Sequence, residues 1–134
     1  MTLLPRILLD TTAYSRLRQG HEGVVALLAR AERVLVPATV LGELEAGFRL
    51  GSRLTENVAT LHLFLEEPFV DVWPTTASVA RRYGAVFAQL RAAGTPIPTN
   101  DMWIAAAALD SGAHLVSFDS DFGRVAGLDW TLLR

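Results

Sequence analysis

Two aspartates follow short apolar runs, at places where buried strands are expected to end. Asp10 closes the run Arg6 to Asp10 (RILLD), and Asp119 follows the run Leu115 to Phe118. In open α/β sheets ligands bind beyond the carboxyl ends of the strands, so both acids are expected to face one crevice. Asp10 also has a structural interpretation, because aspartate is among the best residues for capping the helix expected after it.

Asp101 begins an apolar helical face. The residues three, four and seven positions later share its side of a helix and are all apolar: Ile104, Ala105 and Ala108. The carboxylate is therefore expected to point along the buried face, although the helix dipole also favours an acid in a first turn. Thr99 or Asn100 could supply the cap of this helix. A buried carboxylate needs a partner, and no arginine lies near it in the sequence.

Glu43 lies in a largely apolar helix, with Val40 and Gly47 on its own side and Glu45 projecting toward solvent on another. A glycine inside a helix costs roughly 1 kcal/mol relative to alanine, so Gly47 predicts the close approach of another segment, as in helix–helix contact. Glu43 is a site candidate if its face of the helix turns inward.

Asp121 is interpreted as a turn residue that bonds its own backbone. Asp119 permits the same interpretation. It is favoured as a site residue only because it shares its strand-end position with Asp10.

Four carboxylates in one crevice would repel one another and could not all ionise without a counter-charge. A hard divalent cation supplies that charge, and ligation by oxygen alone suits Mg²⁺ or Mn²⁺. Such a cation can activate water for attack on a phosphodiester. The chain has no cysteine, and its three histidines show no metal-ligand spacing, so we assign no histidine to catalysis.

Alternating strands and helices must position these acids. Apolar patterning predicts strands at 6–10, 34–37, 69–73, 115–118 and 130–133, and helices at 11–19, 24–31, 37–51, 54–65, 76–93 and 101–111. Pro37 is expected in a first turn, Pro68 after a helix end, Thr75 or Thr76 as a cap and Gly94 as a stop. The pattern indicates an α/β fold of three layers, α/β/α, with a parallel sheet of four or five strands. Residues 1–134 show no linker or repeat, which predicts a single domain.

Composition excludes several classes of protein. The formal charge of −2 is unlike that of a basic protein that coats duplex nucleic acid. All 12 basic residues are arginine, which removes every mechanism that needs a lysine. The opening residues do not resemble a secretion signal, and no apolar run could span a bilayer, so a cytoplasmic protein without membrane contact is expected.

Four segments resemble the motifs of the PIN-domain family, and especially the VapC-type ribonuclease toxins of type II toxin–antitoxin systems: LLDTTAYS, VPATVLGELEAG, PTNDMWIAAAAL and HLVSFDSDF. They occur in the family's order over nearly the full chain. The resemblance implies that Asp10, Glu43, Asp101 and Asp119 are catalytic metal ligands, that Thr12 assists them, and that Asp121 is a possible substitute ligand.

The resemblance also implies a function and partners. It implies a PIN-like fold and magnesium-dependent endonucleolytic cleavage of RNA, with Mn²⁺ as a possible substitute. It further implies a homodimer and a cognate VapB-type antitoxin that obstructs the acidic site. The apolar helix Leu54 to Leu65 could offer a groove to a partner helix, although core packing also explains its leucines.

Three other functions could use a similar acidic site. A receiver-like signalling domain with an acidic pocket would need a lysine, and a haloacid-dehalogenase-type phosphatase would need a second aspartate where Thr12 stands. A catalytically silent PIN-like binding module remains an alternative. Trp103 could stack on a base, but a core or dimer role is favoured. Paired arginines could grip RNA phosphates or simply be solvated: Arg16 and Arg18, Arg49 and Arg53, Arg81 and Arg82.

Overall fold

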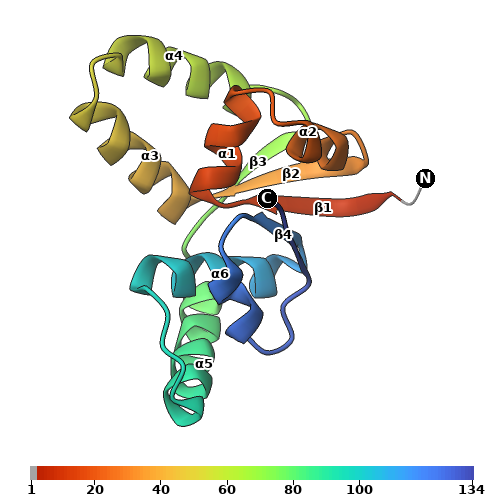
Figure 1. Cartoon of the computed structure of the whole chain (residues 1–134), viewed down its shortest axis with the longest axis vertical. Helices are drawn as coiled ribbons and strands as arrows, with labels where there is room; N and C mark the ends of the chain where they lie inside the picture. The colour runs from red at the N-terminus through yellow and green to blue at the C-terminus, as the bar shows by residue number, and fades with distance from the viewer. Residues whose placement is uncertain (1–2) are drawn as a thin grey trace.

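Five parallel strands form one sheet in the order β3-β2-β1-β4-β5 (Figure 1), in a computed structural model that describes residues 3–134. The strands are β1 (Leu4–Leu9), β2 (Ala31–Pro37), β3 (Val70–Trp73), β4 (His114–Ser117) and β5 (Trp130–Leu132). The central strands are buried on both faces, as is usual for a parallel sheet between helices. The predicted α/β class and parallel sheet are confirmed, with five strands.

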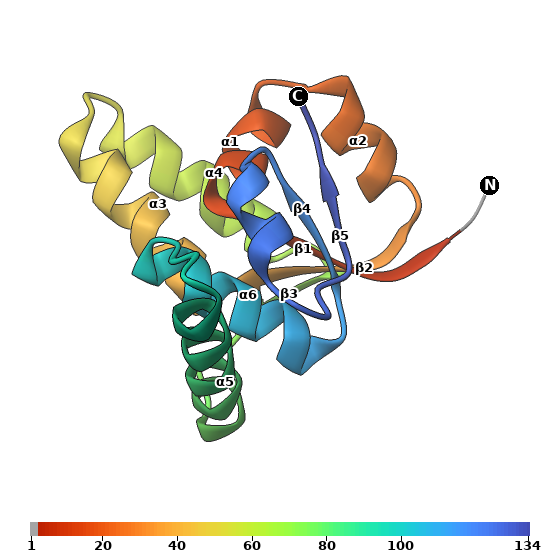
Figure 2. The same ribbon diagram turned by 60° about the horizontal axis from the view of Figure 1, so that its bottom comes forward.

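Helices cover both faces of this sheet. They are α1 (Thr11–Arg18), α2 (Glu22–Leu28), α3 (Ala38–Leu50), α4 (Leu54–Leu65), α5 (Ala77–Ala93) and α6 (Thr99–Ser111), with a short 3₁₀ turn η1 (Ser120–Arg124). Figures 1 and 2 place α1, α2 and α4 on one side of the sheet and α5 and α6 on the other. Helix α3 contacts both α4 and α6, so it links the two layers. The predicted three-layer arrangement is therefore present.

The pairing of β1 with β4 is the feature that assembles the site. Leu9 in β1 stands opposite Val116 in β4. The residues just beyond them, Asp10 and Ser117, consequently emerge at the same edge of the sheet. Because β1 and β4 are adjacent in the sheet although far apart in the sequence, the two aspartates that follow them lie at the same edge.

Several predicted helix ends are confirmed. Thr76 caps α5 by accepting a hydrogen bond from the Val79 N–H, and Gly94 ends the helix in the left-handed conformation with φ of 69°. Glycine adopts that conformation without the steric cost that a side chain brings. These two ends of the longest helix follow directly from the capping chemistry of the sequence.

Other boundaries were predicted wrongly. The second helix does not reach Ala31, because that residue already pairs with Leu4 as part of β2. Pro37 ends β2 and forms the N-cap of α3 instead of lying in its first turn. Neither Thr99 nor Asn100 caps α6, since both lie inside the helix and its N-cap is Pro98, without a side-chain hydrogen bond.

Gly47 does not mark a close approach of another segment. Apart from its chain neighbours and the backbone of its own helix, no heavy atom of residues 3–134 lies within 4 Å of the position that a Cβ would take there, and the residue is exposed on α3. Within residues 3–134, no helix is long and apolar enough to cross a membrane.

Candidate metal centre

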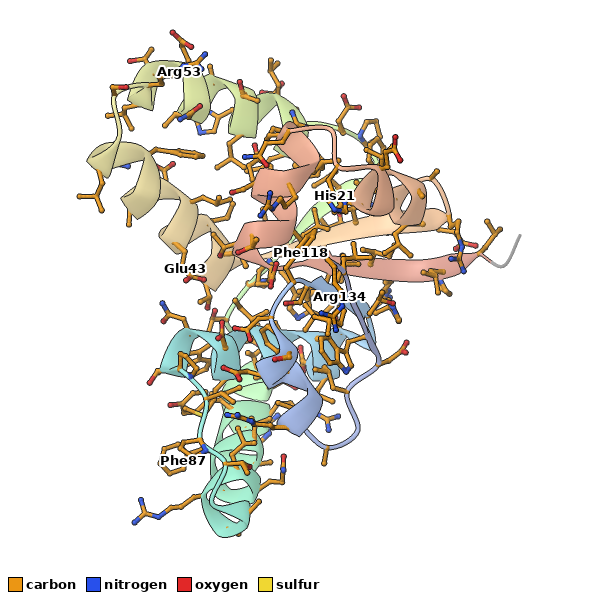
Figure 3. The ribbon with its side chains drawn as sticks, viewed as in Figure 1. His21, Glu43, Arg53, Phe87, Phe118 and Arg134 are labelled. Atoms are coloured by element: carbon orange, nitrogen blue, oxygen red, sulfur yellow. The ribbon has the colours of Figure 1, made fainter. Side chains whose placement is uncertain are left out.

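Acids from four separate segments line one small cavity. Asp10 follows β1, Glu43 lies in α3, Asp101 lies in the first turn of α6, and Asp119 follows β4. The cavity has a volume of about 90 Å³, and its remaining walls are Thr11, Thr12 and Ile104. In Figure 3, Glu43 lies at the end of α3 that faces α6. The four predicted acids and Thr12 are thus brought together.

Asp10 is fixed by hydrogen bonds to both of its oxygens. Oδ1 accepts from the Ala13 N–H at 2.8 Å, and Oδ2 accepts from the Ser117 hydroxyl at 2.6 Å. Asp10 is the N-cap of α1, so the capping interpretation is correct and coexists with a place in the cavity. Burial raises its pKa, the two hydrogen bonds oppose that rise, and Asp119 and Glu43 add to it.

Asp101 carries the strongest electrostatic signal of the site. Burial, as the largest cause, and the negative charges of neighbouring acids together raise its pKa to about 6; these acids are Asp119, Glu43, Asp10 and Asp121. Its side of α6 is apolar as predicted, since Ile104, Ala105 and Ala108 are all buried. The residue itself is only partly buried, because its carboxylate opens into the cavity.

Glu43 is oriented by a residue that the sequence pattern did not single out. Its Oε1 accepts a hydrogen bond of 2.8 Å from the Thr11 hydroxyl. Val40, three residues earlier, is fully buried, so this face of α3 turns inward. The assignment of Glu43 to the site depended on that orientation. Glu45 is held by an ion pair with Arg49 on the helix surface.

Asp119 and Asp121 differ in what they contact. Asp119 caps η1 by accepting from the Asp121 N–H at 2.9 Å, and its own N–H donates to the Ser117 hydroxyl oxygen at 3.0 Å. Asp121 does not line the cavity, and it pairs with Arg124 at 3.5 Å. The turn interpretation therefore holds for Asp119, whose side chain accepts from the backbone two residues later. Asp121 lies in that turn, but its carboxylate pairs with Arg124 and not with the backbone, and of the two residues only Asp119 reaches the cavity.

Ser117 and Thr11 are the two site residues that sequence analysis missed. Ser117 bridges Asp10 and the Asp119 backbone, and it is fully buried. The signal that could have found it is its place at the end of a strand beside β1. Thr11 follows Asp10 directly, and only the packing of α1 against α3 brings it to Glu43.

The donor set fits a hydrated hard cation. Within residues 3–134, none of the four acids takes part in an ion pair with arginine or histidine, so their charge lacks a protein counter-ion. No three acids or histidines of this same range are already arranged to hold a metal directly. Mg²⁺ usually binds through one or two carboxylates and keeps several waters. A cavity of about 90 Å³ has room for such waters.

The comparison with protein families decides the classification. The family model described as PIN domain matches residues 7–128. The chain belongs to the PIN-domain family. The resemblance that its four motifs suggested is thereby confirmed, and the four acids of the cavity all lie inside the matched range.

Individual known proteins also resemble the chain over nearly its whole length. Ribonuclease VapC1 of Haemophilus influenzae (strain R2866) is 26% identical over 128 residues, which are 92% of this chain and 94% of that protein. FitAcB from Neisseria gonorrhoeae has a TM-score of 0.75 at 28% identity, covering 92% and 95% of the two chains. VapBC2 from Rickettsia felis, bound to a promoter DNA fragment, has a TM-score of 0.84 at 21% identity, covering 96% and 99%.

Trp103, His21 and His114 have structural contacts. Trp103 stacks on Tyr83, with ring centroids 4.0 Å apart and planes inclined by 16°. This packing agrees with the favoured core or dimer role. His21 caps α2 by accepting from the Gly23 and Val24 N–H groups, and His114 hydrogen-bonds to Thr131. No histidine lines the acidic cavity.

Proposed function

We propose that the protein is a magnesium-dependent endoribonuclease, with Mn²⁺ able to replace Mg²⁺, and the toxin of a VapBC-type toxin–antitoxin pair. The observation that carries the proposal is the gathering of four acids without a counter-ion in one cavity, with the pKa of Asp101 raised to about 6. Family membership and the ribonuclease among the relatives support the same activity.

The residues have separate tasks in this proposal. Asp10 and Asp101 would hold the cation, with Glu43 and Asp119 helping directly or through water. The cation, when bound, would acidify a water molecule and offset the charge of the phosphate under attack. Ser117 and Ala13 keep the Asp10 carboxylate in place, and the Thr11 hydroxyl does the same for Glu43. Such fixed ligands reduce the rearrangement needed before reaction.

Thr12 lines the cavity and is exposed, so in this proposal its hydroxyl donates a hydrogen bond to a phosphate oxygen. Asp121 remains a substitute ligand only if its ion pair with Arg124 opens.

A groove that could receive a helix of a protein partner supports the toxin part of the proposal. An apolar groove of about 480 Å³ lies between α1, α2 and α4, and its walls include the exposed Val25, Leu63 and Phe69. This is the region where the apolar α4 helix was expected to receive a partner. We propose that a cognate antitoxin helix binds there, as the VapBC complexes among the structural neighbours suggest. We further propose that the toxin acts as a homodimer.

Mapping of RNA cleavage in cells tests this function. Inducing the wild type is expected to produce discrete new RNA 5′ ends and growth arrest, while Asp101→Asn and Asp10→Asn produce neither. The matched control is Glu32→Gln, which makes the same carboxylate-to-amide change at an exposed site on β2. Cleavage by Asp101→Asn at the wild-type level would contradict the assignment. RNA binding without any cleavage by the wild type would instead favour the silent binding module.

A further inference from the structure

A second pocket adjoins the acidic cavity beside the end of β5. It has a volume of about 440 Å³ and is lined by Arg16, Phe118, Ser120, Leu132, Leu133 and Arg134. In Figure 3, Phe118 and Arg134 lie next to each other close to His21, and Figure 2 shows β5 running beside β4 toward this end of the molecule.

Two chain segments place this pocket directly beside the acids. Arg16 follows Thr12 by four residues on α1, so both side chains lie on one face of that helix, about 6 Å apart along its axis. Phe118 and Ser120 flank Asp119 in the sequence. Thr12 and Asp119 line the acidic cavity, whereas their neighbours line the second pocket. A chain molecule bound at the acids can therefore continue into this pocket.

The charge of the pocket is opposite to that of the cavity. Among the residues that the structure describes, no aspartate or glutamate side chain lines it, and both of its charged side chains are arginines. Arg16 is exposed, and within residues 3–134 it forms no ion pair; its guanidinium contacts only Gln19 at 3.5 Å and the Phe118 ring at 5.6 Å. Arg33, Arg53 and Arg124, in contrast, are each paired with a carboxylate.

Phe118 gives the pocket a fixed aromatic wall. The His21 ring packs against it edge to face, with centroids 4.9 Å apart and planes at 87°. His21 is itself anchored, because its Nδ1 caps α2 and its Nε2 lies 3.2 Å from the Arg134 carbonyl oxygen. Leu132 and Leu133 extend the apolar side of the pocket. A pocket that combines guanidinium groups with an aromatic ring suits a nucleotide.

We propose that this pocket binds the nucleotide next to the scissile phosphodiester of a single-stranded RNA. Arg16 and the Ser120 hydroxyl contact its phosphate, and Phe118 contacts its sugar or base. The inference rests on the proposed ribonuclease function and assigns a substrate-binding role to Arg16. A rival occupant is an acidic peptide segment of a protein partner, which would bind the same guanidinium groups but would not need the Phe118 ring.

The first test measures binding of a short fluorescein-labelled single-stranded RNA by Asp101→Asn protein, which binds without cutting. Adding Arg16→Gln is expected to weaken binding about tenfold and to reduce the slope of log affinity against log salt by about 0.7, the change for one phosphate contact on a single strand. Arg16→Lys is expected to retain the slope. The control is Arg82→Gln, which removes an equal charge from the exposed surface of α5.

The second test separates this inference from the proposed function. In the cleaving enzyme, Arg16→Gln is expected to raise KM about tenfold and to change kcat less than twofold. Phe118→Leu, which keeps an apolar side chain, is expected to weaken RNA binding without changing the salt slope. If Arg16→Gln binds and cleaves RNA as the wild type does, the pocket does not hold RNA, and the acidic-peptide occupant is favoured. Absence of cleavage by the wild type would refute the proposed function, while the binding measurement would still decide this inference.

Discussion

Asp10 uses its two carboxylate oxygens for different partners, and substitutions should separate their effects. Asp10→Ala is expected to destabilise the fold by about 1 kcal/mol through loss of the α1 cap. It also leaves the buried Ser117 hydroxyl without its acceptor, which costs a further 1–3 kcal/mol or so. Asp10→Asn keeps a good capping side chain and removes a charge from the crowded cavity. Urea unfolding in EDTA should show Asp10→Ala clearly less stable than Asp10→Asn; equal stability of the two variants would contradict the cap.

Asp101 should make the stability of the metal-free protein depend on pH. Its pKa is about 6 in the folded protein and about 3.8 in the unfolded chain, so the folded state binds the proton of Asp101 more tightly. The stabilisation is present below pH 3.8 and is lost as the pH rises through about 6. Asp71, whose pKa is lowered by its hydrogen bond with Arg33, acts in the opposite direction.

The difference between the wild type and Asp101→Asn isolates this effect. In EDTA the asparagine variant is expected to gain stability relative to the wild type as the pH rises from 4 to 7, as measured by thermal unfolding. A difference that is constant over this range would show that Asp101 does not carry the raised pKa.

At the residue scale, the sequence was informative about charge and less so about hydrogen bonds. An acid that ends a buried strand, or that begins an apolar helix face, is conspicuous because burying a carboxylate is costly. Ser117 and Thr11 carry no such signal, since a serine or threonine in these positions is unremarkable. Their roles depend on which strands and helices become neighbours.

At the element scale, the helices and strands with clear apolar periodicity were predictable. Their ends were predictable only where residues adjacent in the sequence form the cap. Thr76 and Gly94 end α5 through contacts with adjacent residues. Ala31 was misassigned because its conformation is set by β1, which lies far away in the sequence. The prediction that another segment packs against Gly47 failed for a related reason. A glycine in a helix shows only that a side chain is absent there, and the structure is needed to show that no other segment fills the space.

Two glycines should respond oppositely to alanine. Gly47 lies in the interior of an exposed helix with open space around its Cβ position, so Gly47→Ala is expected to stabilise the protein by about 1 kcal/mol. Gly94 has φ of 69°, so Gly94→Ala is expected to destabilise it by about 1–2 kcal/mol. Chemical denaturation of both variants checks the pair. Destabilisation by Gly47→Ala would indicate that another copy or a partner packs on α3.

At the scale of the whole molecule, the proposed functions are divided among three cavities that are each lined in part by α1. The acidic cavity and the arginine-lined pocket lie at the carboxyl edge of the sheet, and the apolar groove lies between α1, α2 and α4. The sequence predicted the sheet, its parallel connections and the gathering of acids at its edge. It also indicated a partner groove beside the helix 54–65, but not the arginine-lined pocket, because Arg16, Phe118 and Leu132 carry no patterning signal that would place them together.

The apolar groove should be separable from catalysis. Leu63 is 67% exposed in the groove wall, so Leu63→Asp is expected to leave folding and RNA cleavage intact. The same change should weaken binding of the cognate antitoxin tenfold or more, because a charge would be buried against its apolar helix face. Co-purification and titration with the co-expressed antitoxin provide the measurement. Unchanged antitoxin affinity would place its binding surface elsewhere.

Cleavage of RNA by the purified protein during a magnesium titration tests the central claim most directly. Wild type and Glu32→Gln are expected to cleave a labelled RNA with a rate that rises with Mg²⁺ and vanishes in EDTA. Asp101→Asn is expected to be at least 100-fold slower at every Mg²⁺ concentration while remaining folded, because each ligand contributes to holding the cation. Cleavage that persists in EDTA, or an Asp101→Asn variant as fast as the wild type, would contradict a metal-dependent site at these four acids.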